Sequence, residues 1–320
     1  MSKGWKKKAI ELMLSTPLSW RKIAKEVGKP KSTVSDYLRQ FKEDPEFLQE
    51  VVVPENKPKI LLYDLETSLI KSYHWGLWNQ NISLGAIIED WYIICWSAKW
   101  LGTDTIINSS VHTEGNPTAE RTRDNEGAVV LALWKLVDEA DILIAYNGKK
   151  FDKKKMNAKF LEYGLPEPSP YKVIDPMLIV KGNFALTSNK MDFVVKYVES
   201  NDKGKLSTNL NLWIRAMEDD REALERMQAY CDEDINVLER VYLAVRHWDK
   251  NAPNLALHYE DNKPRCNGCG SDHLIPIPNK TFNTNLSKFE IVRCGNCSKV
   301  LRTRSTTLTK EKRQSLMMNA

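Results

Sequence analysis

Apolar and polar positions follow two different periods through the middle of the chain, from about residue 59 to residue 250. Short apolar runs at 60–63 and 142–147 have the length and composition of buried strands. Two longer runs, 152–164 and 221–245, repeat their apolar residues at helical spacing. Strand-like and helix-like runs in alternation predict an α/β domain, with a smaller segment on either side of it.

The first segment, residues 1–45, predicts two helices joined by a tight turn at Gly28. Ser19 and Ser32 stand where the N-caps of these helices are expected. The spacing resembles helix-turn-helix DNA-binding domains, whose second helix enters the major groove. A helical hairpin that contacts another protein is the alternative. The resemblance implies nucleic-acid contacts from the second helix, at Lys31, Ser32, Thr33, Ser35 and Arg39.

Charge is distributed unevenly along the chain. Residues 1–42 carry a net charge of +8, residues 261–320 carry +7, and the middle carries −10. Basic ends favour contact with phosphate, and an acidic centre favours cations, although lysines also act simply as solubilising residues. A helix at about 5–15 would complete a three-helix unit, and the charged, proline-bearing stretch 46–58 is expected to be a linker.

Two acids interrupt the first predicted strand of the middle segment, KILLYDLETSLI at 59–70. Asp64 and Glu66 are two residues apart, so their side chains point to the same face of a strand. Burying two like charges together costs several kcal/mol unless a partner compensates them. The pattern therefore raises the question of what these carboxylates hold.

Further acids follow later elements. Asp152 lies where the strand 142–147 gives way to a helix, and strand ends of this kind gather functional groups in α/β sheets. Taken alone, Asp152 fits a helix N-cap equally well. Tyr230 and Asp234 are four apart on the last helix and share one of its faces. Asp175, near the end of another candidate strand, is interpreted as structural.

Together these groups resemble the three exonuclease motifs of the DEDDy branch of the DEDD superfamily, found in proofreading domains of family B polymerases. NGKKFD at 147–152 also matches the Asn-x3-Phe-Asp form of the second motif. The resemblance covers about 59–248, within an expected exonuclease domain of 59–250. It implies a ribonuclease H-like fold, a five-stranded mixed sheet with helices on both sides, and 3′→5′ exonuclease activity. An ordinary α/β domain with scattered acids and a nuclease that binds without cutting are the alternatives.

The resemblance also implies a role for each motif residue. Asp64 would bridge two Mg²⁺ or Mn²⁺ ions, Glu66 and Asp234 would complete the shell of the first, and Asp152 would bind the second. Tyr230 would orient the attacking water. Two further residues would contact the nucleic acid: Leu65 near the terminal base, and Asn147 in the second motif.

Four of the six cysteines form two Cys-x2-Cys pairs near the C-terminus. Four thiolates suit one tetrahedral, structural Zn²⁺ in a reducing compartment. The spacing resembles a zinc ribbon over 260–305, with FEIVRC and KVLRTR as its hairpin strands. Replacement of one cysteine by His273 is the alternative. The expected zinc ligands are Cys266, Cys269, Cys294 and Cys297.

Basic residues around these cysteines suggest a second nucleic-acid contact, with Arg293 and Arg302 as its candidates. Residues 306–320 are expected to form a flexible tail. The aromatic run SYHWGLWNQNIS at 72–83 offers two interpretations. Its tryptophans either stack unpaired bases or pack into the core, and core packing is preferred for most of them.

The order of the three segments resembles stand-alone exonucleases encoded by bacterial viruses. We therefore expect a metal-dependent 3′→5′ DNA exonuclease, held on DNA by both terminal segments, in the cytoplasm of its cell or viral host. Replication or recombination proteins are further expected partners. No apolar run reaches the roughly 20 residues that span a bilayer. A structure-specific endonuclease of the same fold and a DNA-binding regulator are the alternatives. The choices between DNA and RNA, single and double strands, and oligomeric states stay open.

Overall fold

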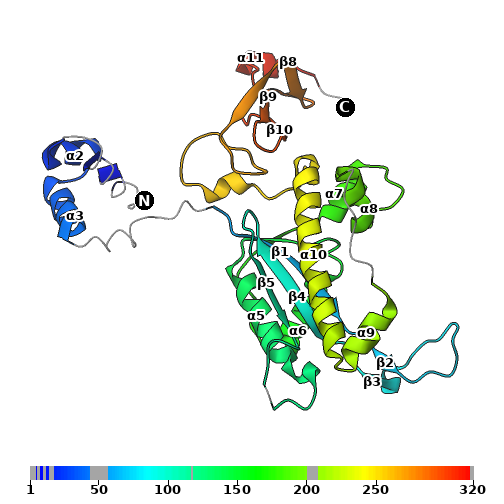
Figure 1. Cartoon of the computed structure of the whole chain (residues 1–320). Helices are drawn as coiled ribbons and strands as arrows, with labels where there is room; N and C mark the ends of the chain where they lie inside the picture. The colour runs from blue at the N-terminus through cyan, green and yellow to red at the C-terminus, as the bar shows by residue number, and fades with distance from the viewer. Residues whose placement is uncertain are drawn as a thin grey trace. The chain divides into compact units, whose positions relative to one another are not determined.

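The computed structural model describes residues 5, 8–9, 12–13, 18–43, 57–116, 118–199 and 208–317. The chain divides into two compact units, Met1–Lys57 and Pro58–Ala320. Figure 1 shows the elements of both units. Among the helices in these ranges, none combines the length and the apolar character needed to cross a bilayer.

The described part of the first unit includes the helices α2 (Trp20–Glu26) and α3 (Lys31–Glu43). They are joined by a turn at Gly28, whose φ of +63° is adopted without strain by a residue that has no Cβ. The ring of Trp5 meets that of Tyr37 edge-on, with centroids 5.4 Å apart. Apolar residues of both helices, together with Ala9, form a small core. Its buried members are Ala9, Ile23, Ala24, Val34, Tyr37 and Leu38.

The expectation that Ser32 caps the second helix is wrong. Helix α3 begins one residue earlier, at Lys31, and the Pro30 carbonyl already accepts from the Val34 N–H at 3.1 Å. Proline suits the position before a helix because its fixed φ is compatible with the first turn. Two other predictions, the helix at 5–15 and the linker at 46–58, lie largely outside the described residues.

The second unit is built on a five-stranded sheet in the order β5-β4-β1-β6-β7. Strand β1 is antiparallel to β4 and parallel to β6; β4 and β5 are antiparallel, and β6 and β7 are parallel. This confirms the five-stranded mixed sheet expected from the sequence. The strands are β1 (Ile60–Thr67), β4 (Ile93–Trp100), β5 (Ile106–Ser110), β6 (Ile142–Ile144) and β7 (Lys172–Ile174).

Helices pack against both faces of this sheet (Figure 1). Side chains alternate along β1, so Leu61 and Tyr63 belong to a core that includes α5 and α6, whereas Leu62 belongs to a core with α7, α8 and α10. The helices are α5 (Glu126–Glu139), α6 (Asp152–Glu162), α7 (Pro176–Asn183), α8 (Met191–Val198), α9 (Leu210–Met217) and α10 (Arg221–Val245).

Helix α10 has the bounds that its amphipathic pattern predicts, 221–245. Helix α6 is terminated as expected by Gly164, which has φ +65° and donates its N–H to the Leu161 carbonyl at 3.1 Å. Cys95, expected in the core, is fully buried on β4.

A two-stranded hairpin, β2 (Lys71–Ser72) and β3 (Ile87–Glu89), leaves the main sheet between β1 and β4. Its connecting loop, residues 73–86, extends away from the sheet next to α9 (Figure 1). The preferred interpretation of its tryptophans as core residues is wrong, because Trp75 and Trp78 are both exposed.

The C-terminal part forms a three-stranded antiparallel sheet in the order β10-β9-β8. Strands β9 (Lys288–Cys294) and β10 (Val300–Arg302) occupy the two expected hairpin segments. Strand β8 (Leu274–Asn283) was not expected, since its two prolines argue against a strand. Its pairing with β9 is interrupted between Pro276 and Thr281, which accommodates them.

The expectation of a flexible tail from residue 306 is wrong for its first part. The hydroxyl of Thr306 donates to the Lys288 carbonyl at 2.9 Å, and the N–H of Thr307 donates to the same oxygen at 2.8 Å. A short helix, α11 (Lys310–Gln314), follows, and the Thr309 hydroxyl caps it. Threonine side chains fix this segment in a way that composition alone does not reveal.

Candidate functional site

The two acids of β1 face α10. Asp64 is opposite Ser97 of β4, and Glu66 is opposite Cys95, so all four side chains share one face of the sheet. Leu65, between them, points to the other face and is only 4% exposed. Its side chain points away from the acids because neighbouring residues of a strand alternate between faces, and the expected position of Leu65 near a terminal base stays a prediction.

Helix α10 brings a third carboxylate to this face. Asp234 is only 3% exposed, and the ligand oxygens of Asp64, Glu66 and Asp234 all lie within 4.8 Å of one another. Three carboxylates at this separation repel one another strongly unless a cation lies between them. Oxygens that share one Mg²⁺ at about 2.1 Å are about 3–4 Å apart, so the set fits a divalent cation.

Tyr230 lies one helical turn before Asp234, so both side chains project from the same side of α10. Its ring is half-buried and meets that of Trp213 from α9 edge-on, with centroids 6.4 Å apart. This contact restricts the ring beside the cluster of acids. The motif residues of β1 and α10 are thus brought together as the sequence predicts.

Asp152 is not part of the three-carboxylate cluster. It is the first residue of α6 and is 3% exposed. Burial raises the pKa of its carboxyl to about 7, with the Asp175 charge adding to the rise and a hydrogen bond from the Leu65 backbone opposing it. Pairing between β1 and β6 ends at Leu62 with Ile144. Beyond that point β1 no longer pairs with β6, and the backbone of Leu65 hydrogen-bonds to the Asp152 carboxylate.

The loop that delivers Asp152 is held by Asp175. Its carboxylate accepts the N–H of Asn147 at 3.0 Å and of Lys149 at 3.3 Å, and it also caps α7 through Met177. This confirms the structural interpretation of Asp175. Asn147 itself has φ +63°, and its backbone is used inside this turn.

Gly148 is required in the same loop because there is no room for a side chain. A Cβ at this position would lie 2.4 Å from the Ala145 Cβ and 3.1 Å from its carbonyl oxygen. Ala145 directly follows β6, so the loop turns back next to the end of the strand. The position of Asp152 therefore depends on this close approach.

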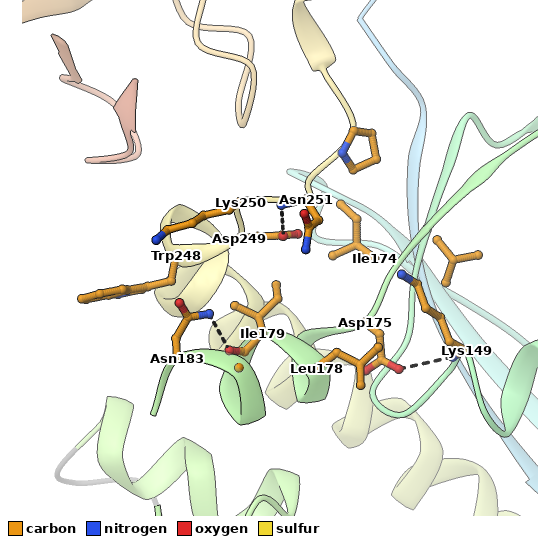
Figure 2. Close-up of a pocket in the computed structure, with 13 residues that line it drawn as sticks. Lys149, Ile174, Asp175, Leu178, Ile179, Asn183, Trp248, Asp249, Lys250 and Asn251 are labelled. Carbon is orange, nitrogen blue, oxygen red and sulfur yellow. Dashed lines mark hydrogen bonds between the residues drawn. The ribbon is translucent and has the colours of Figure 1, made fainter. Parts of the chain in front are cut away.

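A pocket of about 320 Å³ lies next to this loop and is lined in part by Lys149 (Figure 2). None of the three clustered acids lines it. Lys149 and Asp175 border one side in Figure 2, and Trp248 and Lys250, which follow α10, border the other. The pocket is separate from the three clustered carboxylates. One of its cationic side chains, Lys149, belongs to the second motif.

Two buried cysteines lie beneath the acids, which sequence reasoning did not place there. The Sγ of Cys231 is 3.6 Å from the Asp64 carbonyl oxygen and 4.0 Å from its Oδ2. Burial raises the thiol pKa of both Cys231 and Cys95, so both stay neutral. The uncharged thiols add no negative charge to the cluster.

Polar contacts missed from the sequence attach α10 to the sheet. The carboxylate of Asp232 accepts from the Ser97 hydroxyl at 2.5 Å and from the Asn108 amide at 3.0 Å. Further along, Lys99 and Glu239 form a buried ion pair at 2.7 Å. Only the packing of α10 against β4 and β5 brings these residues together. They fix the position of the helix that carries Tyr230 and Asp234.

The four cysteine sulfurs of the C-terminal sheet also lie within 4.8 Å of one another. Cys266 and Cys297 are 3.6 Å apart between sulfurs, and Cys269 and Cys294 are 3.5 Å apart. Ligands of a tetrahedral zinc at about 2.3 Å are about 3.8 Å apart, so these positions fit. The Gly268 N–H approaches the Cys266 sulfur at 3.4 Å, as expected for such a turn.

His273 does not belong to this cluster. Of the cationic candidates nearby, Arg293 is exposed and donates to the Ser298 carbonyl at 3.1 Å. Arg302 is also exposed, and its guanidinium lies 4.1 Å from the centre of the Phe289 ring. Of the candidates on α3, Ser35 is half-buried and the others are exposed: Lys31, Ser32, Thr33 and Arg39.

A comparison with protein families agrees with this fold. A family model described as RNase_H superfamily matches residues 101–246. Among solved structures, the family B DNA polymerase of the hyperthermophilic archaeon Pyrobaculum calidifontis is similar at 13% identity and a TM-score of 0.39. That match covers 59% of this chain and 26% of the polymerase chain, so this chain spans about a quarter of it. No curated protein matches the sequence. By its sheet order and by the family match, the central domain is a ribonuclease H-like domain.

Proposed function

We propose that the chain is a metal-dependent 3′→5′ exonuclease that hydrolyses DNA phosphodiester bonds. The observation that carries the proposal is the convergence of Asp64, Glu66 and Asp234 within 4.8 Å on one face of a ribonuclease H-like sheet. The match to the RNase_H superfamily supports a nuclease. The order of the motifs, with Tyr230 one turn before Asp234, supports the DEDDy type.

The residues of the site have separable tasks in this proposal. Asp64, Glu66 and Asp234 would hold divalent cations, Mg²⁺ or Mn²⁺, and Asp152 would contribute from the neighbouring loop. Bound cations of this kind supply positive charge for a reacting phosphate and acidify water. The Tyr230 hydroxyl donates a hydrogen bond that orients the attacking water. Asp234 and Asp152 are buried, whereas Asp64 and Glu66 are partly exposed.

The terminal modules would bind nucleic acid. In the first unit, the exposed face of α3 would enter the major groove, in the manner of a helix-turn-helix domain. In the C-terminal sheet, one structural Zn²⁺ on the four cysteines would stabilise a basic ribbon next to the nuclease domain. The ribbon contacts the end of α10, since Lys299 donates to the Asp249 carbonyl at 2.7 Å.

A time course on single- and double-stranded DNA, labelled at either end, tests the activity. With Mg²⁺ or Mn²⁺, the proposal predicts mononucleotides released from a 3′ label and a ladder receding from the 3′ end of a 5′-labelled strand. EDTA should stop both. Intact substrate in the presence of Mn²⁺ would count against an enzyme and favour a DNA-binding regulator. Discrete internal fragments would favour a structure-specific endonuclease.

A further inference from the structure

The loop of the β2–β3 hairpin, residues 73–86, exposes large apolar side chains to an unusual degree. Trp75 is 104% exposed, Trp78 83% and Tyr73 74%. Leu77 and Leu84 are exposed to a similar extent. Single exposed apolar residues are ordinary, but a contiguous group of this size marks an interaction surface. We call residues 73–86 the aromatic tip.

The stem below the tip is held firmly. The carboxylate of Glu89 on β3 pairs with Arg121 at 2.9 Å, with Lys71 of β2 at 3.2 Å and with Arg123 at 3.3 Å. The Arg121 hydrogen bond holds the pKa of Glu89 below its usual range. The Leu69 N–H also contacts the Met217 sulfur of α9 at 3.4 Å. The domain therefore presents the tip from a fixed base.

The chemistry of the tip selects its partner. No acidic residue occurs from Thr67 to Ile88, although the middle of the chain carries a net charge of −10. Phosphates can therefore approach the tip without meeting a carboxylate of this segment. Trp and Tyr rings stack on nucleobases whatever the base, and amide side chains such as Asn79 and Gln80 offer donors and acceptors to base edges.

The short stretch of chain between the acids and the aromatic tip limits the distance between them. Glu66 of the cluster is seven residues before Tyr73 on the same chain. Seven residues span at most about 25 Å, a distance equal to about seven nucleotides of a DNA strand at about 3.4 Å each. A strand with its end at the carboxylates thus reaches Tyr73 within about seven nucleotides. Trp78, twelve residues after Glu66, lies at most about 43 Å away, or about thirteen nucleotides.

We infer that the aromatic tip stacks the bases of the single strand whose 3′ end occupies the carboxylate site. This inference rests on the proposed nuclease function and adds a strand-binding surface to it. Stacking on Trp75 and Trp78 adds contacts with nucleotides upstream of the scissile end. Affinity should therefore rise with strand length until the strand is long enough to reach the tip.

Binding without cleavage provides the test. Anisotropy of a labelled oligothymidylate of about twelve nucleotides, in EDTA, is measured for the full chain and for the Trp75→Ala/Trp78→Ala double variant. Two lost stacks, at about 1–3 kcal/mol each, predict a loss of affinity of about thirty-fold or more. The Trp75→Phe/Trp78→Phe variant should recover most of it. Leu161→Ala, which removes an equally exposed apolar side chain on α6, should change nothing.

A second measurement locates the contact. Photo-crosslinking of a 5-iodouracil strand should attach it within residues 73–84. Unchanged affinity of the double alanine variant, or crosslinks only elsewhere, would overturn the inference. Binding of anionic lipid vesicles that needs the tryptophans, with oligonucleotide affinity unaffected, would overturn it in favour of a membrane contact. If tip-dependent binding is found but Mn²⁺ produces no cleavage, the nuclease proposal fails while the stacking surface stands.

Discussion

At the scale of single residues, the second motif depends on the packing and hydrogen bonds of the loop that carries Asp152. Asp152 is positioned by a loop in which Asn147 adopts a left-handed conformation and Asp175 collects backbone N–H groups. Gly148 allows this loop to turn back onto Ala145. The second motif is therefore held in place by packing and backbone hydrogen bonds.

Replacing Gly148 tests this dependence. In Gly148→Ala the new methyl group would lie 2.4 Å from the Ala145 Cβ, so the loop must shift. Unfolding experiments should show a loss of about 1–3 kcal/mol, and cleavage should fall because Asp152 moves. Gly182→Ala is the control, since a Cβ there meets nothing within 4 Å in helix α7. It should be neutral or up to about 1 kcal/mol more stable. Equal effects of the two changes would contradict the account.

The ion pair between Lys99 and Glu239 gives a second prediction. Both side chains are largely buried, so Glu239→Gln leaves an uncompensated ammonium and should cost about 3–5 kcal/mol of unfolding free energy. The exposed pair Lys59–Glu139 is the control, and Glu139→Gln should cost about 1 kcal/mol or less. Chemical denaturation measures both. Similar values for the two variants would show that α10 is not anchored by this pair.

At the scale of elements, the sequence predicted the helices and strands whose apolar residues recur at a regular spacing. The bounds of α10 follow from an amphipathic repeat over 25 residues, and the strands that carry the acids follow from short apolar runs. Strand β8 was missed because local proline signals were outweighed by pairing with β9. The contacts of Asp232 and of Glu239 depend on how α10 packs against the sheet, which no local pattern contains. The burial of Leu65 follows from the alternation of side chains along β1.

The C-terminal sheet should depend on its metal. Zinc contributes folding free energy directly in small domains with little core, and apart from the cysteines few buried residues support β8, β9 and β10. Chelation, or Cys294→Ser, should release one zinc per chain and remove hydrogen-exchange protection from these strands. Strands β1 and β4 should keep theirs. A metal-free protein with full protection of β9 would contradict the proposal.

At the scale of the whole molecule, the two ends of the chain are basic and the middle is acidic. This distribution suits a nuclease domain that holds cations and terminal modules that bind phosphate. The two units, Met1–Lys57 and Pro58–Ala320, are separately compact. Affinity for DNA and the chemistry of cleavage should therefore be separable by mutation.

The salt dependence of DNA binding tests the role of the first unit. Removing two phosphate contacts in Lys31→Ala/Arg39→Ala should weaken binding and reduce the slope of log affinity against log salt by about 2. Arg21→Ala/Lys25→Ala removes two exposed cations from α2 and should have a smaller effect. Anisotropy on duplex DNA at several salt concentrations gives both slopes. A larger effect of the α2 variant would contradict the assignment of α3 to the groove.

The most direct test of the central claim compares two acids two residues apart on α10. Asp234 belongs to the three-carboxylate cluster, whereas Asp232 binds Ser97 and Asn108 outside it. Mn²⁺ binding, followed by electron paramagnetic resonance, and cleavage of 3′-labelled DNA are measured for Asp234→Asn and Asp232→Asn. The account predicts that Asp234→Asn loses a Mn²⁺ site and cleavage falls by about a hundred-fold or more, while Asp232→Asn keeps both. Full Mn²⁺ binding and cleavage in Asp234→Asn would contradict it.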